Sequence, residues 1–481
     1  MALHDELLSG KEVRLFPCHR ISSDREAELQ ATASLLAVAC AVSEFGRAIV
    51  KIAGGPPGQL SCYTEVPFKV QTGATSREER PDGVFLVKRG KTAWTALVEV
   101  KVGDTSLDQD QFDRYHTLAC DQDIDAFITI SNQSALANGL PPELTFNSSK
   151  LKKVRVSHLS WESLLSEAQL LSSYNRVADA DQQWILYEWI RYLADPQSRI
   201  IKPPQMGEHW NKVLLCARDR NFDACKSELN DVVQHWDAFL RKVALRLRAK
   251  LGAGVKLITS KSEQNDPGLL IKNLYAAAII NSELSGVLRI PDAAGDLSVV
   301  VLLAARSVQY SIKVEAPTEG KAITRIKWML RQLNPRDVPD DLVFHVDWGR
   351  GLCSQARIGD LKGEVDSLLW DNNVDRLLWD NSNQNFLPNK ASPQSFSLKW
   401  TIGLRKGKAH STAPVLERID REVEYFYRRV VAGLRPFVRK APQLQPGEEE
   451  SSDVDSTKQR QNDPVAPTTE KPVTESEESH S

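Results

Sequence analysis

The 481-residue chain is long enough for two or three domains, and its 41% apolar and 26% charged residues are typical of globular protein. No apolar run reaches the ~20 residues of a membrane-spanning helix, and the charged N-terminus lacks an apolar signal core, so we expect no membrane partner and no secretory signal. The seven cysteines form no CxxC pair, which favours free thiols and a cytoplasmic location over a zinc site or a disulfide framework.

The formal charge of -2 is unevenly distributed along the chain. Residues 1–440 contain 58 basic and 53 acidic residues, a balance of +5, whereas residues 441–481 contain three basic and ten acidic residues, a balance of -7. The mildly basic part permits nucleic acid as a partner. Residues 441–481 are rich in Glu, Ser, Thr and Pro, so we predict a disordered acidic tail.

The first 160 residues alternate between helical and strand patterns. A long helix is predicted over 24–52, where Gly54-Gly55-Pro56 ends it. Strand patterns follow, interrupted by one helix, and Arg89-Gly90 is a hairpin signal. The predicted strands are 59–70, 83–88, 93–102, 125–132 and 152–159, and the helix is 106–122. This order favours an α/β domain, 1–160, with a mixed sheet flanked by helices.

The remainder divides by pattern into a helical region, 161–250, and an α+β module, 251–440. In the module we predict strands that are mostly antiparallel, and two helices, 319–333 and 412–437. The predicted strand segments are "GVKLITS", "NLYAAAIINSELSGVLRIP", "DLSVVVLLAARSVQYSIKVEA", "LVFHVDWG" and "SFSLKWTIGLRK". The last helix mixes arginines with aromatic residues, which suits either nucleic acid or inward packing of the aromatics. The module is therefore a candidate for target recognition or for a protein partner.

Charged side chains interrupt a strand that should be buried. In "ALVEVKV", Leu97, Glu99 and Lys101 share one face because side chains alternate along a strand. Antiparallel pairing about the hairpin turn brings Glu99 opposite a residue near Asp82. Two buried carboxylates repel each other unless a cation relieves them, and oxygen ligands suit Mg²⁺ or Mn²⁺. The pattern therefore predicts metal ligands at Asp82 and Glu99, with Lys101 beside them.

Pro81-Asp82 followed by Glu99-Val100-Lys101 across a hairpin resembles the PD-(D/E)xK nuclease superfamily, with its restriction-endonuclease-like fold, over about residues 24–160. "QFDRY", from Gln111 to Tyr115, resembles the QxxxY motif of RecB-like members, where both residues lie near the nucleic acid. The resemblance implies Mg²⁺-dependent hydrolysis of phosphodiester bonds, with DNA as the expected substrate. It also implies an acidic ligand on the first helix or strand, for which Glu28 and Glu65 are the candidates.

Three alternatives remain open. Glu99 and Lys101 also fit an ion pair on an exposed strand, and Gln111 and Tyr115 also fit a solvated Gln and a half-buried Tyr. The third alternative is a nuclease fold without catalysis that acts as a regulatory module and binds nucleic acid or protein. The intact set of Asp82, Glu99 and Lys101 favours the enzyme. The sequence contains no Walker A loop, which argues against ATP-driven translocation within this chain.

Overall fold

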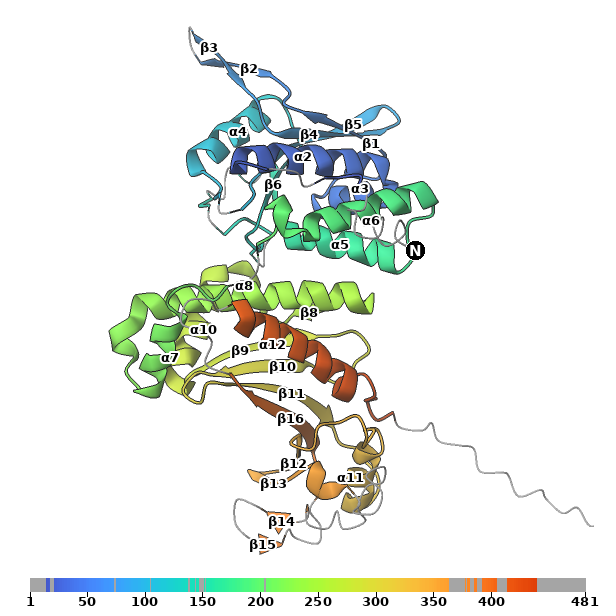
Figure 1. The fold of residues 1–481 in the computed structure, drawn as a ribbon, viewed down its shortest axis with the longest axis vertical. Coiled ribbons are helices and arrows are strands. Elements are labelled where there is room, and N and C mark those ends of the chain that lie inside the picture. Colours follow the sequence, from blue (N-terminus) through green and yellow to red (C-terminus); the bar gives the residue numbers. More distant parts are fainter. Residues whose placement is uncertain are drawn as a thin grey trace, which may run out of the picture. The chain divides into compact units, whose positions relative to one another are not determined.

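The structure is a computed structural model. It describes residues 14–17, 21–72, 75–103, 105–136, 139–142, 144–146, 151, 153–202, 205–362, 377, 379–380, 385–386, 392–404 and 413–438. The predicted acidic tail, 441–481, lies outside the described residues. Two sheets with their covering helices organise the described part of the chain (Figure 1).

The first sheet has five strands in the order β1-β4-β5-β6-β7, and it is mixed as predicted. The first three of these pair antiparallel, whereas β5, β6 and β7 pair parallel. The strands are β1 (Gln59–Thr64), β4 (Gly83–Arg89), β5 (Thr92–Val100), β6 (Ala126–Ser131) and β7 (Arg155–Ser160). Parallel strands need a crossover, and α4 (Gln109–Asp121) makes it between β5 and β6.

The prediction of a single long helix over 24–52 is wrong. The chain forms α2 (Asp24–Ala41) and α3 (Ser43–Ile52), bent by 110° at Val42, which has extended backbone angles. Gly46 permits the tight bend, because a Cβ there would lie 2.2 Å from the carbonyl oxygen of Ala39. Among the described residues no single helix is long and apolar enough to cross a membrane. Only α2 and α3 taken together, despite the bend between them, reach the length and apolar composition of such a helix.

The prediction of one strand over 59–70 is also wrong, because this segment forms two separate strands. β1 ends at Thr64, Glu65 takes a left-handed φ of 48°, and Pro67 follows before β2 (Phe68–Thr72) begins. β2 pairs with β3 (Thr75–Glu79) in a separate hairpin that projects beyond the sheet (Figure 1). A strand cannot run through a left-handed residue and a proline without losing its ladder, so the chain leaves the sheet here.

The residues predicted as a separate helical region, 161–250, are divided between two hydrophobic cores. α5 (Trp161–Ser173) and α6 (Ala180–Ala194) bury Trp161 and Trp189 against α2, α3 and the first sheet. α7 (Trp210–Arg218) and α8 (Lys226–Leu251) pack into the core of the second sheet. The other face of the first sheet packs against α4 in a smaller apolar cluster.

The second sheet has seven strands, all paired antiparallel, in the order β13-β12-β16-β11-β10-β9-β8. α8 and α12 (Ala413–Phe426) contribute to the core against one of its faces (Figure 1). The strands are β8 (Lys256–Leu257), β9 (Glu283–Arg289), β10 (Leu297–Leu302), β11 (Ser307–Glu315), β12 (Val343–Gly349), β13 (Leu352–Arg357) and β16 (Ser395–Gly403). The helix predicted over 319–333 is α11 (Ala322–Leu330).

One predicted strand of this module begins too early. The residues "NLYAAAIIN" lie in α10 (Pro267–Asn281) and not in a strand. Asp266 caps this helix by accepting from the backbone N–H of Gly268, and Pro267 occupies its first turn. Both features start a helix, and the run of three alanines sustains it.

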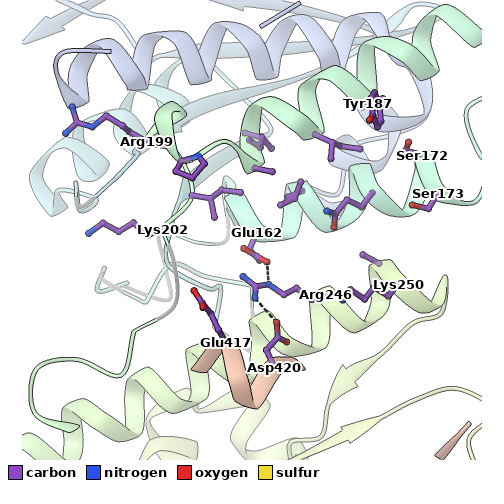
Figure 2. A pocket seen from close by; sticks show the side chains of 18 of the residues that line it. Glu162, Ser172, Ser173, Tyr187, Arg199, Lys202, Arg246, Lys250, Glu417 and Asp420 are labelled. Atoms are coloured by element: carbon purple, nitrogen blue, oxygen red, sulfur yellow. Dashed lines mark hydrogen bonds and ion pairs between the residues drawn. The ribbon is translucent and has the colours of Figure 1, made fainter. Parts of the chain in front are cut away.

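A cavity of about 980 Å³ lies where α5 and α6 face α8 and α12 (Figure 2). Arg246 bridges Glu162 and Asp420 here, at 2.7 Å and 2.8 Å. Burial raises the pKa of Asp420, and Arg246 acts against that rise. Helices from both cores therefore share one partly buried ion-pair network.

Candidate active site

The hairpin β4–β5 brings two carboxylates together. Its register pairs Gly83 with Val98, so Asp82 and Glu99 are the next residues on the two strands. Asp82 is fixed by its Oδ2, which accepts from the backbone N–H of Val100 at 2.8 Å. The predicted adjacency of Asp82 and Glu99 is present in the structure.

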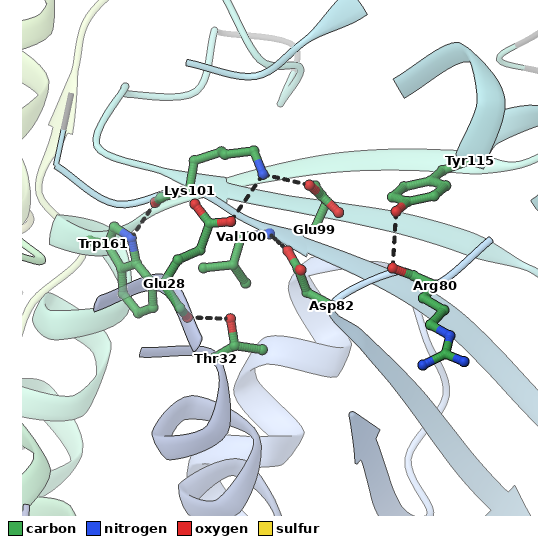
Figure 3. A network of polar contacts seen from close by, with 9 residues as sticks. All are labelled: Glu28, Thr32, Arg80, Asp82, Glu99, Val100, Lys101, Tyr115 and Trp161. Carbon is green, nitrogen blue, oxygen red and sulfur yellow. Dashed lines mark hydrogen bonds and ion pairs between the residues drawn. The ribbon is translucent and has the colours of Figure 1, made fainter. Parts of the chain in front are cut away.

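Lys101 joins this pair to the first helix (Figure 3). Its Nζ donates to Glu99 at 2.7 Å and to Glu28 at 3.2 Å. The backbone of Lys101 is held on both sides, because its N–H donates to the carbonyl of Ile130 at 2.8 Å and its carbonyl accepts from the indole of Trp161 at 2.9 Å. Lys101 and Glu99 are both buried, which rules out the exposed ion pair considered from the sequence.

The protonation of the cluster follows from its burial and its charges. Burial and the neighbouring charge of Asp82 raise the pKa of Glu99 to about 8. Burial also raises the pKa of Asp82 and that of Glu28. Burial acts to lower the pKa of Lys101, but the carboxylates of Glu99 and Glu28 more than offset this and raise it. Three carboxyl groups thus surround one ammonium, and their full ionisation requires more positive charge than Lys101 supplies.

Glu28 and Glu65, the two acidic candidates for an additional ligand, both lie near Asp82, but they differ in burial and in their contacts. Glu28 is half-buried on α2 and is bonded to Lys101. Glu65 is exposed at the end of β1, its backbone N–H donates to the carbonyl of Asp82 at 3.4 Å, and its charge raises the pKa of that carboxyl. Glu28 therefore belongs to the cluster, whereas Glu65 lies at its rim.

The helix α4 carries Gln111 and Tyr115. Asp108 caps this helix by accepting from the backbone N–H of Gln111 at 2.7 Å. The hydroxyl of Tyr115 donates to the carbonyl of Arg80 at 3.0 Å, two residues before Asp82. Burial raises the pKa of Tyr115, a hydrogen bond with Gln111 lowers it, and the charges of Glu99 and Asp82 raise it further. Tyr115 thus lies beside the carboxylates and supports the backbone that leads to Asp82, and Gln111 contacts Tyr115.

Two features of the cluster bear on whether it could hold a divalent cation. Within the described part of the chain, no group of three or more His, Cys, Asp and Glu is arranged to hold a metal ion. The second oxygen of Glu99, Oε2, is nevertheless buried without a hydrogen-bond partner. Once Glu99 ionises, this buried oxygen is costly unless a cation reaches it. Asp82 and Glu99 therefore fit as oxygen ligands for Mg²⁺ or Mn²⁺.

Sequence reasoning missed a polar row across the sheet. Glu99 pairs with Thr129 on β6, and Thr129 pairs with His158 on β7. The Nδ1 of His158 lies 2.8 Å from the Thr129 hydroxyl, and its Nε2 lies 3.0 Å from the carbonyl of Gln133. Burial lowers the pKa of His158 to about 4, so the ring is neutral at pH 7. The only sequence signal was a histidine within an apolar strand.

Comparison of the chain with protein-family models, with curated proteins and with solved structures finds no match. The nuclease resemblance therefore rests on the motif residues and on the order of the elements that present them.

Proposed function

We propose that the protein is a metal-dependent nuclease that hydrolyses phosphodiester bonds, with DNA as its substrate. The observation that carries the proposal is the convergence of Asp82, Glu99 and Lys101 at the ends of two paired strands, with Glu28 completing the cluster. One buried and two partly buried carboxyl groups around one ammonium cost stability, and a binding or catalytic site is the usual reason to keep such a cluster.

Each residue of the cluster has a role in this proposal. Asp82 and Glu99 would hold the cation, which when bound supplies a Lewis acid and lowers the pKa of a water molecule. The ammonium of Lys101 would stabilise the negative charge that develops on the phosphate. Glu28 orients Lys101 through their ion pair of 3.2 Å. Tyr115 keeps the segment before Asp82 in place through its bond to Arg80.

Cleavage assays on plasmid and single-stranded DNA test the proposal. We expect cleavage with Mg²⁺ or Mn²⁺ that EDTA stops and that Asp82→Ala abolishes. Asp121→Ala, at the exposed end of α4, is the control and should cleave like the wild type. Equal trace activity in the wild type and in Asp82→Ala would refute the nuclease.

The second candidate is a nuclease fold without catalysis that binds nucleic acid or protein. One observation favours it: Lys101 already pairs with Glu99 and Glu28, so the cluster is partly neutralised without a metal. Calorimetric titration with Mn²⁺ separates the two candidates. The enzyme predicts binding that Asp82→Ala removes, whereas the binding module predicts no difference between the two proteins.

A further inference from the structure

The second sheet has one covered face and one open face. Along its central strands, buried apolar side chains alternate with side chains that are exposed or partly exposed, most of them polar. The buried set, including Tyr310, Phe344 and Phe396, belongs to the core that α8 and α12 complete. The opposite face, here called the open face, carries mostly small polar and basic residues. Its central polar and basic members are Ser298, Gln309, Ser311, Lys313, His345, Gln355, Arg357, Ser397, Lys399 and Thr401, and Val300 and Val343 lie among them.

The strand register places three cations, Lys313, Lys399 and Arg357, close together on the open face. Lys399 on β16 and Arg357 on β13 both pair with Val343 of β12, so they lie in one row across the sheet. Two strand spacings separate their backbones, which is about 10 Å. Lys313 pairs with Ser397, two residues before Lys399 on the same strand. The three cations therefore form one compact group.

The three cations are not neutralised by neighbouring carboxylates. No ion pair joins Lys313, Lys399 or Arg357 to a carboxylate among the described residues, whereas several other cations of this half of the molecule are paired. Arg289, on the same sheet, pairs with Asp296 at 2.9 Å, and Lys362 pairs with Asp340 at 2.6 Å. The central cations of the open face thus keep their charge available to a ligand.

The acidic residues of this face lie towards its ends. Glu315 and Asp347 both pair with Ser395, at one end of the strands, and Glu283 begins β9. Asp347 is itself satisfied, because its carboxylate accepts from the backbone N–H of Gly349 at 2.8 Å and from Ser395 at 3.3 Å. Burial and the charge of Lys399 lower the pKa of His345, so that ring adds no charge at pH 7. The centre of the face is therefore positive.

We propose that the open face binds the sugar–phosphate backbone of duplex DNA. Lysine, arginine, serine, threonine and glutamine side chains are the usual donors to phosphate oxygens, and they position a duplex without reading its sequence. The central members of the face include no aromatic side chain on which an unpaired base could stack, so a duplex fits better than a single strand. The choice of nucleic acid as ligand rests on the proposed function, and the surface rests on its own geometry.

The test is a binding experiment that needs no cleavage. Fluorescence anisotropy with a short labelled duplex, in EDTA, compares the wild type with the triple variant Lys313→Ala, Arg357→Ala, Lys399→Ala. The matched control removes three cations that are exposed and already paired, Lys212→Ala, Arg218→Ala and Lys226→Ala. Both variants lose the same formal charge, and circular dichroism and thermal melting confirm that both fold.

We expect the open-face variant to bind about tenfold or more weakly at about 0.15 M salt, and its slope of log K against log [salt] to fall by about 2–3, since each lost phosphate contact removes about 0.9. The control should change neither quantity appreciably. Equal effects of the two variants would overturn the inference, as would a single-stranded oligonucleotide that loses as much affinity as the duplex. Because no metal is present, a failed cleavage assay and a failed binding assay are distinguishable outcomes.

Discussion

Lys101 is held at both ends before any ligand arrives. Its ammonium contacts two carboxylates, and its backbone is bonded to Ile130 and to Trp161. A side chain fixed in this way loses little freedom when it meets a phosphate, so its contribution should appear mainly in the transition state.

Lys101→Ala should therefore lower the single-turnover cleavage rate by about 10²–10³, which is the usual effect of removing one such stabilising group, with only a few-fold change in the dissociation constant for DNA. Lys91→Ala, in the exposed turn of the same hairpin, is the matched control. The measurement is single-turnover kinetics at saturating Mg²⁺ beside an anisotropy titration. A Lys101→Ala protein that cleaves at the wild-type rate would show that this ammonium acts only in the fold.

Glu99 should make stability depend on pH. Its pKa rises from 4.5 to about 8 on folding, so its contribution to stability is fully present below 4.5 and is lost as pH rises through 8. Lys101 titrates above this window, because its pKa is raised from 10.5. The amide side chain that Glu99→Gln introduces cannot ionise. The difference in melting temperature, variant minus wild type, should therefore increase as the pH rises from about 5 to about 9.

Differential scanning fluorimetry across this range, without metal, measures the difference. Mg²⁺ should reduce it at high pH, because a cation compensates the ionised carboxylate of the wild type. A constant offset between the two proteins would contradict the raised pKa. His158 also changes stability as the pH falls from about 6.5 to about 4, because burial lowers its pKa, but both proteins contain it and its effect cancels in the difference.

The sequence allowed part of this cluster to be predicted. A two-residue period and a hairpin turn suffice to place Asp82 beside Glu99, because a turn fixes the register of the strands that it joins. The row from Glu99 through Thr129 to His158 could not be predicted in the same way. Parallel strands are joined by long crossovers, and a crossover does not determine which residues lie opposite each other.

At the scale of elements, the bend between α2 and α3 depends on Gly46. Gly46→Ala would place a methyl group against the carbonyl oxygen of Ala39, and overpacking of this kind costs about 1–3 kcal/mol. Gly254→Ala is the control, because a Cβ at Gly254 meets no atom within 4 Å. Chemical denaturation should show a clear loss for the first variant and a near-neutral effect for the second. Equal stability of both variants would mean that the bend relaxes easily.

Elements with strong local signals were predicted well, and breaks within apolar segments were not. The hairpin β4–β5 has a turn signal and clear alternation, and its prediction is confirmed. The apolar pattern runs through Val42 without a proline or glycine, and Gly46 lies four residues beyond the bend, where a glycine alone does not predict it. Packing between α2, α3 and the sheet, which only the folded chain provides, gives Gly46 its effect.

At the scale of the whole molecule, residues after 440 should be dispensable for stability. They contain few large apolar residues, and their balance of -7 would repel nucleic acid. A chain truncated after Lys440 should keep its melting temperature and bind DNA equally well or better. Calorimetry and anisotropy measure the two properties, and a large fall in melting temperature would contradict the prediction.

The division of the cores between Ile200 and Met206 has a practical consequence. Core residues up to Ile200 belong to the first sheet, and those from Met206 onward belong to the second. Contacts between α5 and α8 join the two sides, including a hydrogen bond of 2.7 Å from Ser166 to Leu245. Two co-expressed fragments, 1–204 and 205–481, should therefore reassemble without a peptide bond between them and co-elute on gel filtration. Such a split protein would allow each fragment to be labelled or titrated separately. If the two fragments eluted separately, the covalent connection would be needed for assembly.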